Sequence, residues 1–396
     1  MKIAILSDFH LGYERFREDA YRQAEEALNK ASQTADAIII PGDIFDNRTP
    51  KPDVLAEAIN LFRGLSKKEW GAQVVEFLGE GQHYTKTPII AIPGTHERRA
   101  QDVMDPVDLL GLTGLIVDVS NATAMLEKSG EKVAIVGIGG IADERFREIV
   151  LKINPRPVDG AFSVFMFHES VYELLPFNES FIKLEELPKD FDLYVCGHIH
   201  SRLESSVHGK RLLIPGSTVL TQLKSGEQEK KGFYVYDTLT GKYEFIEIDS
   251  RRFVVLEIGL DGHDSAHAVE LIESGIKGML GSDMPIIRVV LEGKQKSGDM
   301  EMELSGLPKR YEGRALVEIS KSGIDISRIG EANLGLATKT FENMSVKDYG
   351  IGVFIEKLKD KNVNFGRISP IELLDILSSE PNKDKAVEKA LNELAA

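Results

Sequence analysis

Five short apolar runs in the first half of the chain are each followed closely by histidine or aspartate. The runs cover residues 3–6, 38–40, 89–92, 164–167 and 193–195. Their length and composition predict buried strands of a layered α/β fold. Side chains just beyond the carboxyl ends of such strands gather at one edge of a sheet, where these folds keep their sites. The pattern predicts one site assembled from segments that are far apart in the sequence.

The polar residues that follow these runs are of the types that bind divalent cations. They are Asp8 and His10 in Asp-Phe-His, Asp43 after a glycine, His96 in Gly-Thr-His-Glu, His168, and His198 with His200 in Gly-His-Ile-His. Two cations about 3.5–4 Å apart can activate water and neutralise a phosphoryl group. One carboxylate must bridge them, and Asp43 is the candidate. His198 and His200 alternate along an extended segment and therefore face the same way. The order of motifs predicts a two-metal phosphoesterase.

Each motif alone has an ordinary structural explanation. Asp8 is compatible with a helix N-cap, Gly42-Asp43 with a turn, and His168 with a buried histidine that only packs. The ordered set, each member placed after an apolar run, outweighs those explanations. The other histidines lie in polar contexts or lack a matching carboxylate, and we expect them at the surface: His83, His208, His263 and His267.

Charge limits the partners of this chain. Its 396 residues carry a formal net charge of −15, and such a field repels nucleic acid. Binding to DNA would then depend on metals, a partner subunit or local basic clusters. The candidate clusters are Arg98-Arg99, Lys230-Lys231 and Lys309-Arg310, and each is more often a solvated surface than a contact patch.

Location and redox state follow from what the sequence lacks. We find no export signal and no run of about 18 apolar residues, so a cytoplasmic protein without membrane association is expected. The single cysteine, Cys196, excludes an internal disulfide and is expected to pack in the core.

Residues 1–250 are expected to form the catalytic domain, because strand and helix patterns alternate there. Helices are expected over 18–32 and 52–65, and a loop or short helix over 71–87. The apolar pattern of residues 251–322 predicts a small α+β domain. Its strands are expected at 253–258, 285–291 and 314–319, and its helix at 265–276.

The C-terminal part predicts a linker at 323–344 and two helices within 345–396. Ser345 and Ser369-Pro370 are typical helix starts, and apolar residues follow each at helical spacing. These apolar faces need a partner surface, either on the same chain or, as we favour, on another protein.

Longer stretches resemble the calcineurin-like metallophosphoesterases and, within them, the Meiotic Recombination Eleven and SbcD group of DNA-repair nucleases. The resemblance rests on GDIFDNRTPKP at 42–52, LPKDFDLYVCGHIHSR at 187–202, IPGST at 214–218 and KGFYVYD at 231–237. It implies an α/β sandwich of two mixed sheets flanked by helices, a small α+β capping domain and a C-terminal helical pair.

The resemblance also implies the roles of the site residues. The first metal would be held by Asp8, His10, Asp43 and His200, and the second by Asp43, His168, His198 and the residue at position 95. His96 matches the family's catalytic histidine, which contacts the phosphate, and Asp46 matches the residue that orients it. The family has asparagine where this chain has Thr95, so weaker binding, a water in its place and a shifted metal all stay open.

The implied activity is that of a metal-dependent DNA nuclease in double-strand break repair. The resemblance implies two Mn²⁺ ions, 3′-to-5′ exonuclease action on duplex ends and endonuclease action on single strands. It also implies a homodimer that binds a Rad-fifty-type coiled-coil ATPase through residues 345–396. Two alternatives stay open: a small-molecule metallophosphodiesterase, which the acidic charge favours, and a DNA-end-binding scaffold with weak catalysis, which Thr95 favours.

Overall fold

The computed structural model describes residues 1–79, 85–98, 103–175, 181–223, 227–260, 265–281, 283–294 and 300–325. The chain divides after Ile324. Every element below lies within residues 1–325. The helices predicted after Ser345, together with His83 and His263, lie outside the described residues.

A six-stranded mixed sheet runs in the order β13-β12-β1-β2-β4-β5. Its strands are β1 (Lys2–Ile5), β2 (Ala37–Pro41), β4 (Ile89–Ile92), β5 (Val117–Asp118), β12 (Gly232–Asp237) and β13 (Tyr243–Glu247). β1, β2, β4 and β5 are parallel neighbours, whereas β12 pairs antiparallel with β1 and with β13. The carboxyl ends of three predicted strands therefore meet at one edge.

A seven-stranded mixed sheet runs in the order β10-β11-β9-β8-β7-β6-β3. Its strands are β3 (Gln73–Leu78), β6 (Ala122–Lys128), β7 (Glu131–Ile138), β8 (Phe162–Phe167), β9 (Leu193–Cys196), β10 (Leu203–Val207) and β11 (Lys210–Ile214). β7, β8, β9 and β11 are parallel, and the outer pairs are antiparallel. The other two predicted strands, β8 and β9, lie side by side at its centre.

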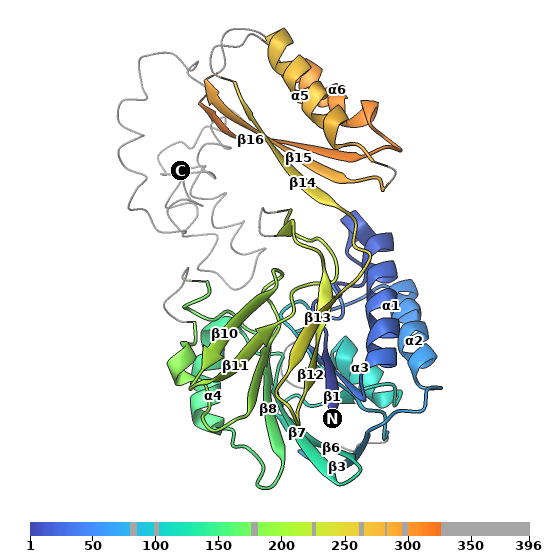
Figure 1. Ribbon diagram of the computed structural model, residues 1–396, viewed down its shortest axis with the longest axis vertical. Coiled ribbons are helices and arrows are strands. Elements are labelled where there is room, and N and C mark those ends of the chain that lie inside the picture. The colour runs from blue at the N-terminus through green and yellow to red at the C-terminus, as the bar shows by residue number, and fades with distance from the viewer. Residues whose placement is uncertain are drawn as a thin grey trace, which may run out of the picture. The chain divides into compact units, whose positions relative to one another are not determined.

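The two sheets pack face to face, and helices cover their outer faces (Figure 1). The helices are α1 (Arg17–Thr34), α2 (Pro52–Leu65), α3 (Pro106–Leu112) and α4 (Asp143–Ile153), with 3-10 turns at Glu14–Phe16 and Leu184–Glu186. α1, α2 and α3 pack on the six-stranded sheet, and α4 packs on the seven-stranded sheet. The expected helices at 18–32 and 52–65 correspond to α1 and α2.

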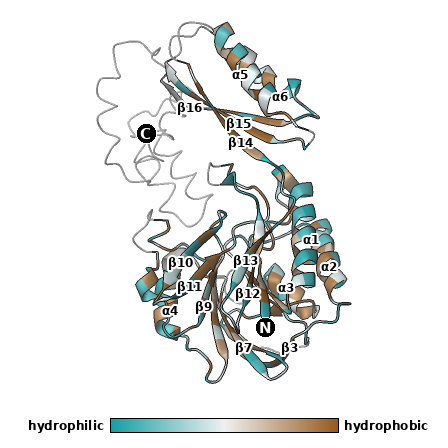
Figure 2. Cartoon of the chain, in the orientation of Figure 1, coloured by the Kyte–Doolittle hydropathy of each residue, from teal (hydrophilic) through white to brown (hydrophobic). Residues whose placement is uncertain are grey.

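Burial explains why the strands read as continuous apolar runs. Ile39 faces the opposite sheet while its neighbours Ile38 and Ile40 face the helices, and all three are fully buried. A strand covered on both faces keeps apolar residues at every position. Figure 2 shows the resulting brown strands inside the sandwich. Cys196 is buried in the core, as predicted.

A third sheet, in the order β14-β15-β16, follows the sandwich. Its elements are β14 (Phe253–Gly259), α5 (Ser265–Met279), β15 (Ile286–Lys294), α6 (Met300–Arg310) and β16 (Leu316–Asp325). Side chains of α5 and α6 share one buried cluster with β15 and β16. We call residues 253–325 the cap. The sequence predicted its strands and α5 but not α6, which contains Pro308.

Two predictions need correction. Residues 71–87 were expected to lack a strand, yet Gln73–Leu78 forms β3, an edge strand that pairs with β6. The apolar residues of this strand come in adjacent pairs and do not alternate with polar residues, so the sequence lacks the period-2 pattern of a strand. Val75 and Leu78 are exposed. Lys231, expected at the surface, is buried.

None of the helices in the described part of the chain combines the length and the apolar composition that spanning a membrane requires.

Candidate metal centre

The residues predicted to bind metal lie just past the carboxyl ends of five strands and converge in space. Asp8 and His10 follow β1, Asp43 follows β2, Thr95 follows β4, His168 follows β8, and His198 and His200 follow β9. Ligand atoms of Asp8, His10, Asp43 and His200 lie within 4.8 Å of one another, as do those of Asp43, His168 and His198. The two groups share Asp43.

The backbone at the site is strained. Asp8, His10, Asp43 and His198 have φ angles of 54°, 47°, 50° and 75°, in the left-handed region that non-glycine residues rarely adopt. Such conformations cost free energy and persist where the surrounding fold imposes them, often at functional sites. Four of them among the ligands indicate that the fold orients these side chains.

Close packing at the strand ends requires glycine. A Cβ at Gly42 would lie 2.4 Å from Nδ1 of His168, and φ there is +91°. A Cβ at Gly94 would lie 2.3 Å from Oδ1 of Asp43. Glycine therefore lets the two turns approach the ligands.

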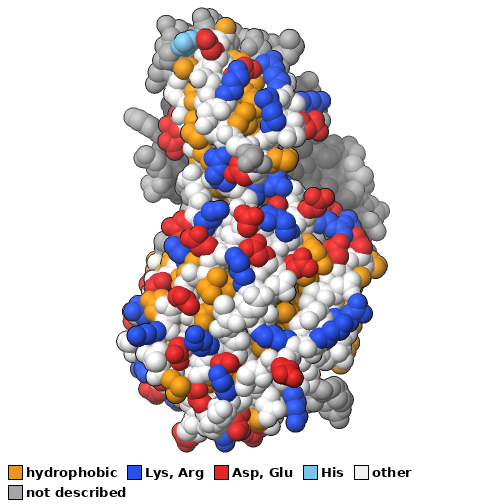
Figure 3. Space-filling view, turned by 45° about the vertical axis from the view of Figure 1, so that its right-hand side comes forward, with side chains coloured by type: hydrophobic (Ala, Val, Ile, Leu, Met, Phe, Trp, Pro, Cys, Tyr) orange, Lys and Arg blue, Asp and Glu red, His pale blue; other side chains and the backbone are white. Residues whose placement is uncertain are grey.

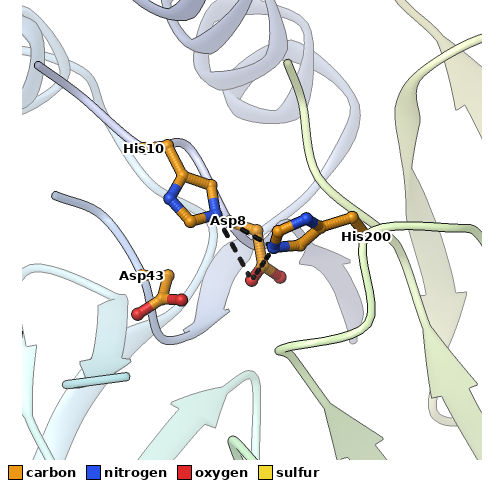
Figure 4. Close-up of side chains that lie close together, drawn as sticks. All are labelled: Asp8, His10, Asp43 and His200. Atoms are coloured by element: carbon orange, nitrogen blue, oxygen red, sulfur yellow. Dashed lines mark hydrogen bonds and ion pairs between the residues drawn. The ribbon is translucent and has the colours of Figure 1, made fainter. Parts of the chain in front are cut away.

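The first group brings two imidazoles together over a carboxylate (Figure 4). Nε2 of His10 and Nε2 of His200 are 3.1 Å apart. Oδ1 of Asp8 lies 4.0 Å from the first of these nitrogens and 3.7 Å from the second. Nδ1 of His10 donates to Oδ1 of Asp46 at 3.1 Å, which leaves the Nε2 lone pair toward the cluster.

The second group centres on Asp43. Its Oδ2 lies 3.2 Å from Nε2 of His168, whose Nδ1 donates to the carbonyl of Pro41 at 2.6 Å. Oγ1 of Thr95 lies 3.0 Å from Nδ1 of His198. The structure thus places Thr95 beside a predicted ligand, as the sequence motif implies.

Buried polar atoms at the centre lack the partners that burial normally demands. Oδ2 of Asp8 is buried without a hydrogen bond among the described residues, and Oδ2 of Asp43 and Nε2 of His168, which form an ion pair with each other at 3.2 Å, have no other partner there. Carboxylate oxygens and imidazole nitrogens suit divalent transition metals. These atoms therefore fit divalent metal binding, and Asp43 belongs to both groups of candidate ligands.

Burial and charge shift the protonation of the ligands. Burial opposes ionisation of Asp43, but the nearby imidazoles outweigh it and lower its pKa. Burial likewise opposes charge on His168, yet the Asp43 carboxylate raises the pKa of His168 to about 10. Burial, then His10 and Lys231, lower the pKa of His200 well below its usual value. A neutral His200 keeps a lone pair for a cation.

The predicted catalytic residues lie beside the first group. His96 is 44% exposed, and its Nδ1 donates to the backbone carbonyl of Asp46 at 3.0 Å. The Asp46 carboxylate lies 3.6 Å from the same nitrogen and closer to His10. Asp46 thus contacts both rings, one through its main chain and one through its side chain.

The sequence motif included Glu97 without assigning it a role. Its buried carboxylate accepts hydrogen bonds from the backbone N–H groups of Asp43, Phe45 and Gly94 at 2.8–3.1 Å. It therefore ties the turn after β4 to the turn after β2. The position of Glu97 directly after His96 in the Gly-Thr-His-Glu motif was the available signal.

His208 and His267 stand apart from both groups, as expected. His208 is exposed and bonds to the carbonyl of Leu187. His267 is half exposed and pairs with Glu270.

Comparison with known proteins identifies the family. Residues 1–202 match the family described as Calcineurin-like phosphoesterase. The chain belongs to this family, and the predicted fold class of two mixed sheets with flanking helices is confirmed. The predicted enzyme class, a metal-dependent phosphoesterase, is confirmed at the level of the family.

Within the family the chain is similar to double-strand break repair proteins. It is 27% identical over 308 residues to "Double-strand break repair protein MRE11" of Encephalitozoon cuniculi, covering 71% of this chain and 53% of that protein. It is 28% identical over 287 residues to "DNA double-strand break repair protein Mre11" of Methanopyrus kandleri, covering 65% and 59%. It is also 24% identical over 312 residues to the protein of the same name from Sulfolobus acidocaldarius. That match covers 74% of this chain and 75% of that protein.

These relatives confirm the predicted resemblance to Meiotic Recombination Eleven. The chain spans less than two thirds of the length of the first two of them.

Proposed function

We propose that this chain is a two-metal DNA nuclease that acts in double-strand break repair. The observation that carries the proposal is the convergence of six predicted ligands into two groups that share Asp43. The similarity to Mre11 proteins supports DNA as the substrate class. We further propose Mn²⁺ as the metal. Nitrogen and oxygen ligands suit manganese, iron and zinc alike, and the resemblance to the Meiotic Recombination Eleven and SbcD group is what supports manganese.

Bound cations would supply activation of water and neutralisation of charge on the phosphoryl oxygens. Asp8, His10, Asp43 and His200 would hold one, and Asp43, His168, His198 and Thr95 the other. The fixed carboxylates and imidazoles do not have to reorganise when charge develops.

His96 is suited to assist the leaving oxygen. Its Nδ1 is engaged by the Asp46 carbonyl, so the proton that a charged ring can give up is on Nε2. The ring packs edge to face against His10 at 4.8 Å, beside the first group. A charged imidazole there would stabilise the phosphate and protonate the departing 3′ oxygen. We propose Asp46 as the residue that positions it.

A groove next to this site is suited to a phosphodiester chain. It has a volume of about 530 Å³ and is lined by residues that include Tyr13, Arg15, Asp46, Asn47 and Lys51. On the face shown in Figure 3, acidic and basic side chains are interspersed. DNA contact would therefore rest on local groups and the metals, since the net charge of −15 gives no general attraction.

A nuclease assay tests the proposal. With Mn²⁺, the protein should degrade duplex DNA from its ends and cut single strands, and a chelator should stop both. A small chromogenic diester provides the comparison. Cleavage of the diester without cleavage of DNA would favour a small-molecule phosphodiesterase, and DNA-end binding without cleavage would favour a scaffold.

We also propose that residues 345–396 bind a coiled-coil ATPase and that the protein works as a homodimer. The apolar faces predicted after Ser345 and Ser369 support the first statement. A chain ending before Ser345 should still bind metal but no longer bind the ATPase. Unfolding of the shortened chain, with no ATPase binding by the full chain, would assign these residues to the core instead.

A further inference from the structure

The imidazoles of the metal centre differ in what holds their Nδ1 atoms. For His10 the partner is a carboxylate, and for His168 it is a backbone carbonyl. These groups only accept hydrogen bonds, so they keep a proton on Nδ1 and leave Nε2 as the nitrogen that faces the cluster. For His200 the partner is the hydroxyl of Thr221, which can donate or accept. A further contact of Thr221 must therefore determine which atom donates in this hydrogen bond.

Glu227 makes that contact. Its Oε1 lies 3.4 Å from Oγ1 of Thr221 and 3.3 Å from the backbone N of the same residue. Its Oε2 accepts from the backbone N–H groups of Gln222 and Leu223, both at 2.8 Å. An ionised carboxylate only accepts, so the Thr221 proton goes to Glu227. The Thr221 oxygen then accepts from Nδ1–H of His200.

Lys231 holds Glu227 and His200 together. It is 5% exposed, and its Nζ donates to Oε1 of Glu227 at 3.1 Å and to the carbonyl of His200 at 3.0 Å. Its third proton goes to Oγ of Ser217 at 3.0 Å. All three ammonium protons are therefore used, and a buried charge with these partners is compatible with the fold. The ion pair also places a positive charge directly beside the Glu227 carboxylate.

The cap anchors the far side of the same segment. Nη1 of Arg288, on β15, donates to the carbonyl of Leu223 at 2.8 Å. Leu223 and Leu220 also share a buried cluster with Phe253 and Ile286 of the cap. The residues that hold His200 from behind are thus held in turn by the cap.

We propose that Thr221, Glu227 and Lys231 form a positioning relay that fixes His200 with Nε2 toward the metal, and that the cap anchors this relay. The inference rests on the proposed metal centre, in which His200 is a ligand. None of the three residues touches the reacting atoms, so they act through His200. Supporting groups of this kind typically change metal affinity by about 10- to 100-fold.

Thr221→Val tests the relay, because it removes the hydroxyl and keeps the shape. Thr221→Ser restores the hydroxyl, and Thr218→Val is the matched control. Thr218 is a buried threonine three residues away whose Oγ1 has no hydrogen bond among the described residues. Nitrogen-15 NMR of the metal-free proteins reports the tautomer of His200, calorimetry with Mn²⁺ alone reports affinity, and thermal unfolding checks the fold.

The wild type, Thr221→Ser and Thr218→Val should each show the Nδ1–H tautomer of His200. Thr221→Val should show both tautomers and lose about 10- to 100-fold in affinity at one of two sites. An unchanged tautomer and affinity in Thr221→Val would overturn the relay and leave Thr221 a packing residue. If the wild type binds no Mn²⁺, the proposed function fails, while the tautomer in metal-free protein still tests the relay.

Discussion

The two halves of the metal centre are built with unequal support. Asp8 and Asp43 contribute two carboxylates to the first group, whereas the second has Asp43 alone. In the first group, Asp46 and the Thr221–Glu227–Lys231 relay hold the imidazoles. In the second, the Pro41 carbonyl holds His168, and the hydroxyl of Thr95 lies against His198. More negative charge and firmer support favour tighter cation binding in the first group.

The largest effect is expected at Asp43, the residue that both groups share. Asp43→Asn should weaken both sites, because each cation loses an attraction on the order of 4 kcal/mol per unit charge at about 4 Å and an effective dielectric of about 20. Affinity should fall more than about 100-fold at each site in calorimetry. Asp53→Asn, at an exposed aspartate on α2, is the control. Loss of only one site would mean that Asp43 does not bridge.

His96 separates chemistry from metal binding. His96→Ala should lower cleavage by about 10²–10⁴-fold while both Mn²⁺ steps stay as in the wild type, because its imidazole is assigned to the phosphate. Replacing the exposed His208 by alanine should change neither measurement. Full nuclease activity in His96→Ala would remove the proposed role.

Substitutions of Thr95 test whether the second group binds Mn²⁺ more weakly than the first. Mn²⁺ titration of the wild type should show a tighter and a weaker step, and Thr95→Asn should strengthen the weaker one. The longer amide should place its oxygen better than the hydroxyl does, and a well-made oxygen ligand contributes on the order of 1–3 kcal/mol, or about 10- to 100-fold. Thr95→Val should weaken that step further. Two equal steps that neither variant alters would show that the hydroxyl serves as well as an amide.

The smallest effect is expected at the cap anchor. Arg288→Met removes the hydrogen bond to the Leu223 carbonyl and should lower the free energy of unfolding by about 1.5–3 kcal/mol. Mn²⁺ affinity should fall only a few-fold, because Glu227 still contacts Thr221 and Lys231 still holds Glu227. The measurements are denaturant unfolding and calorimetry, with Arg314→Met on the cap surface as the control. A loss as large as that of Thr221→Val would place the anchor within the relay itself.

The sequence alone predicted the central strands of the sandwich and the candidate ligands that the structure brings together. A strand buried on both faces must be apolar throughout, so residues 38–40 and 89–92 could be recognised locally. Residues that follow β1, β2 and β4 then had to meet at one edge of their sheet, whereas His168, His198 and His200 come from the other sheet and join them through the packing of the two sheets. The sequence analysis did not predict β3, whose apolar residues are partly exposed at a sheet edge. It also did not predict α6, because Pro308 lies inside that helix.

Only the tertiary structure decided what supports the ligands. Lys231 follows another lysine and a glutamate, which is typical of a surface segment, yet folding buries it against the carbonyl of His200. Glu97 likewise acquires three backbone donors from two separate turns. The apolar strands are specified by local composition. The partner of a buried charge depends on which loop folds over it, and residues 31 positions apart carry no local signal of that contact.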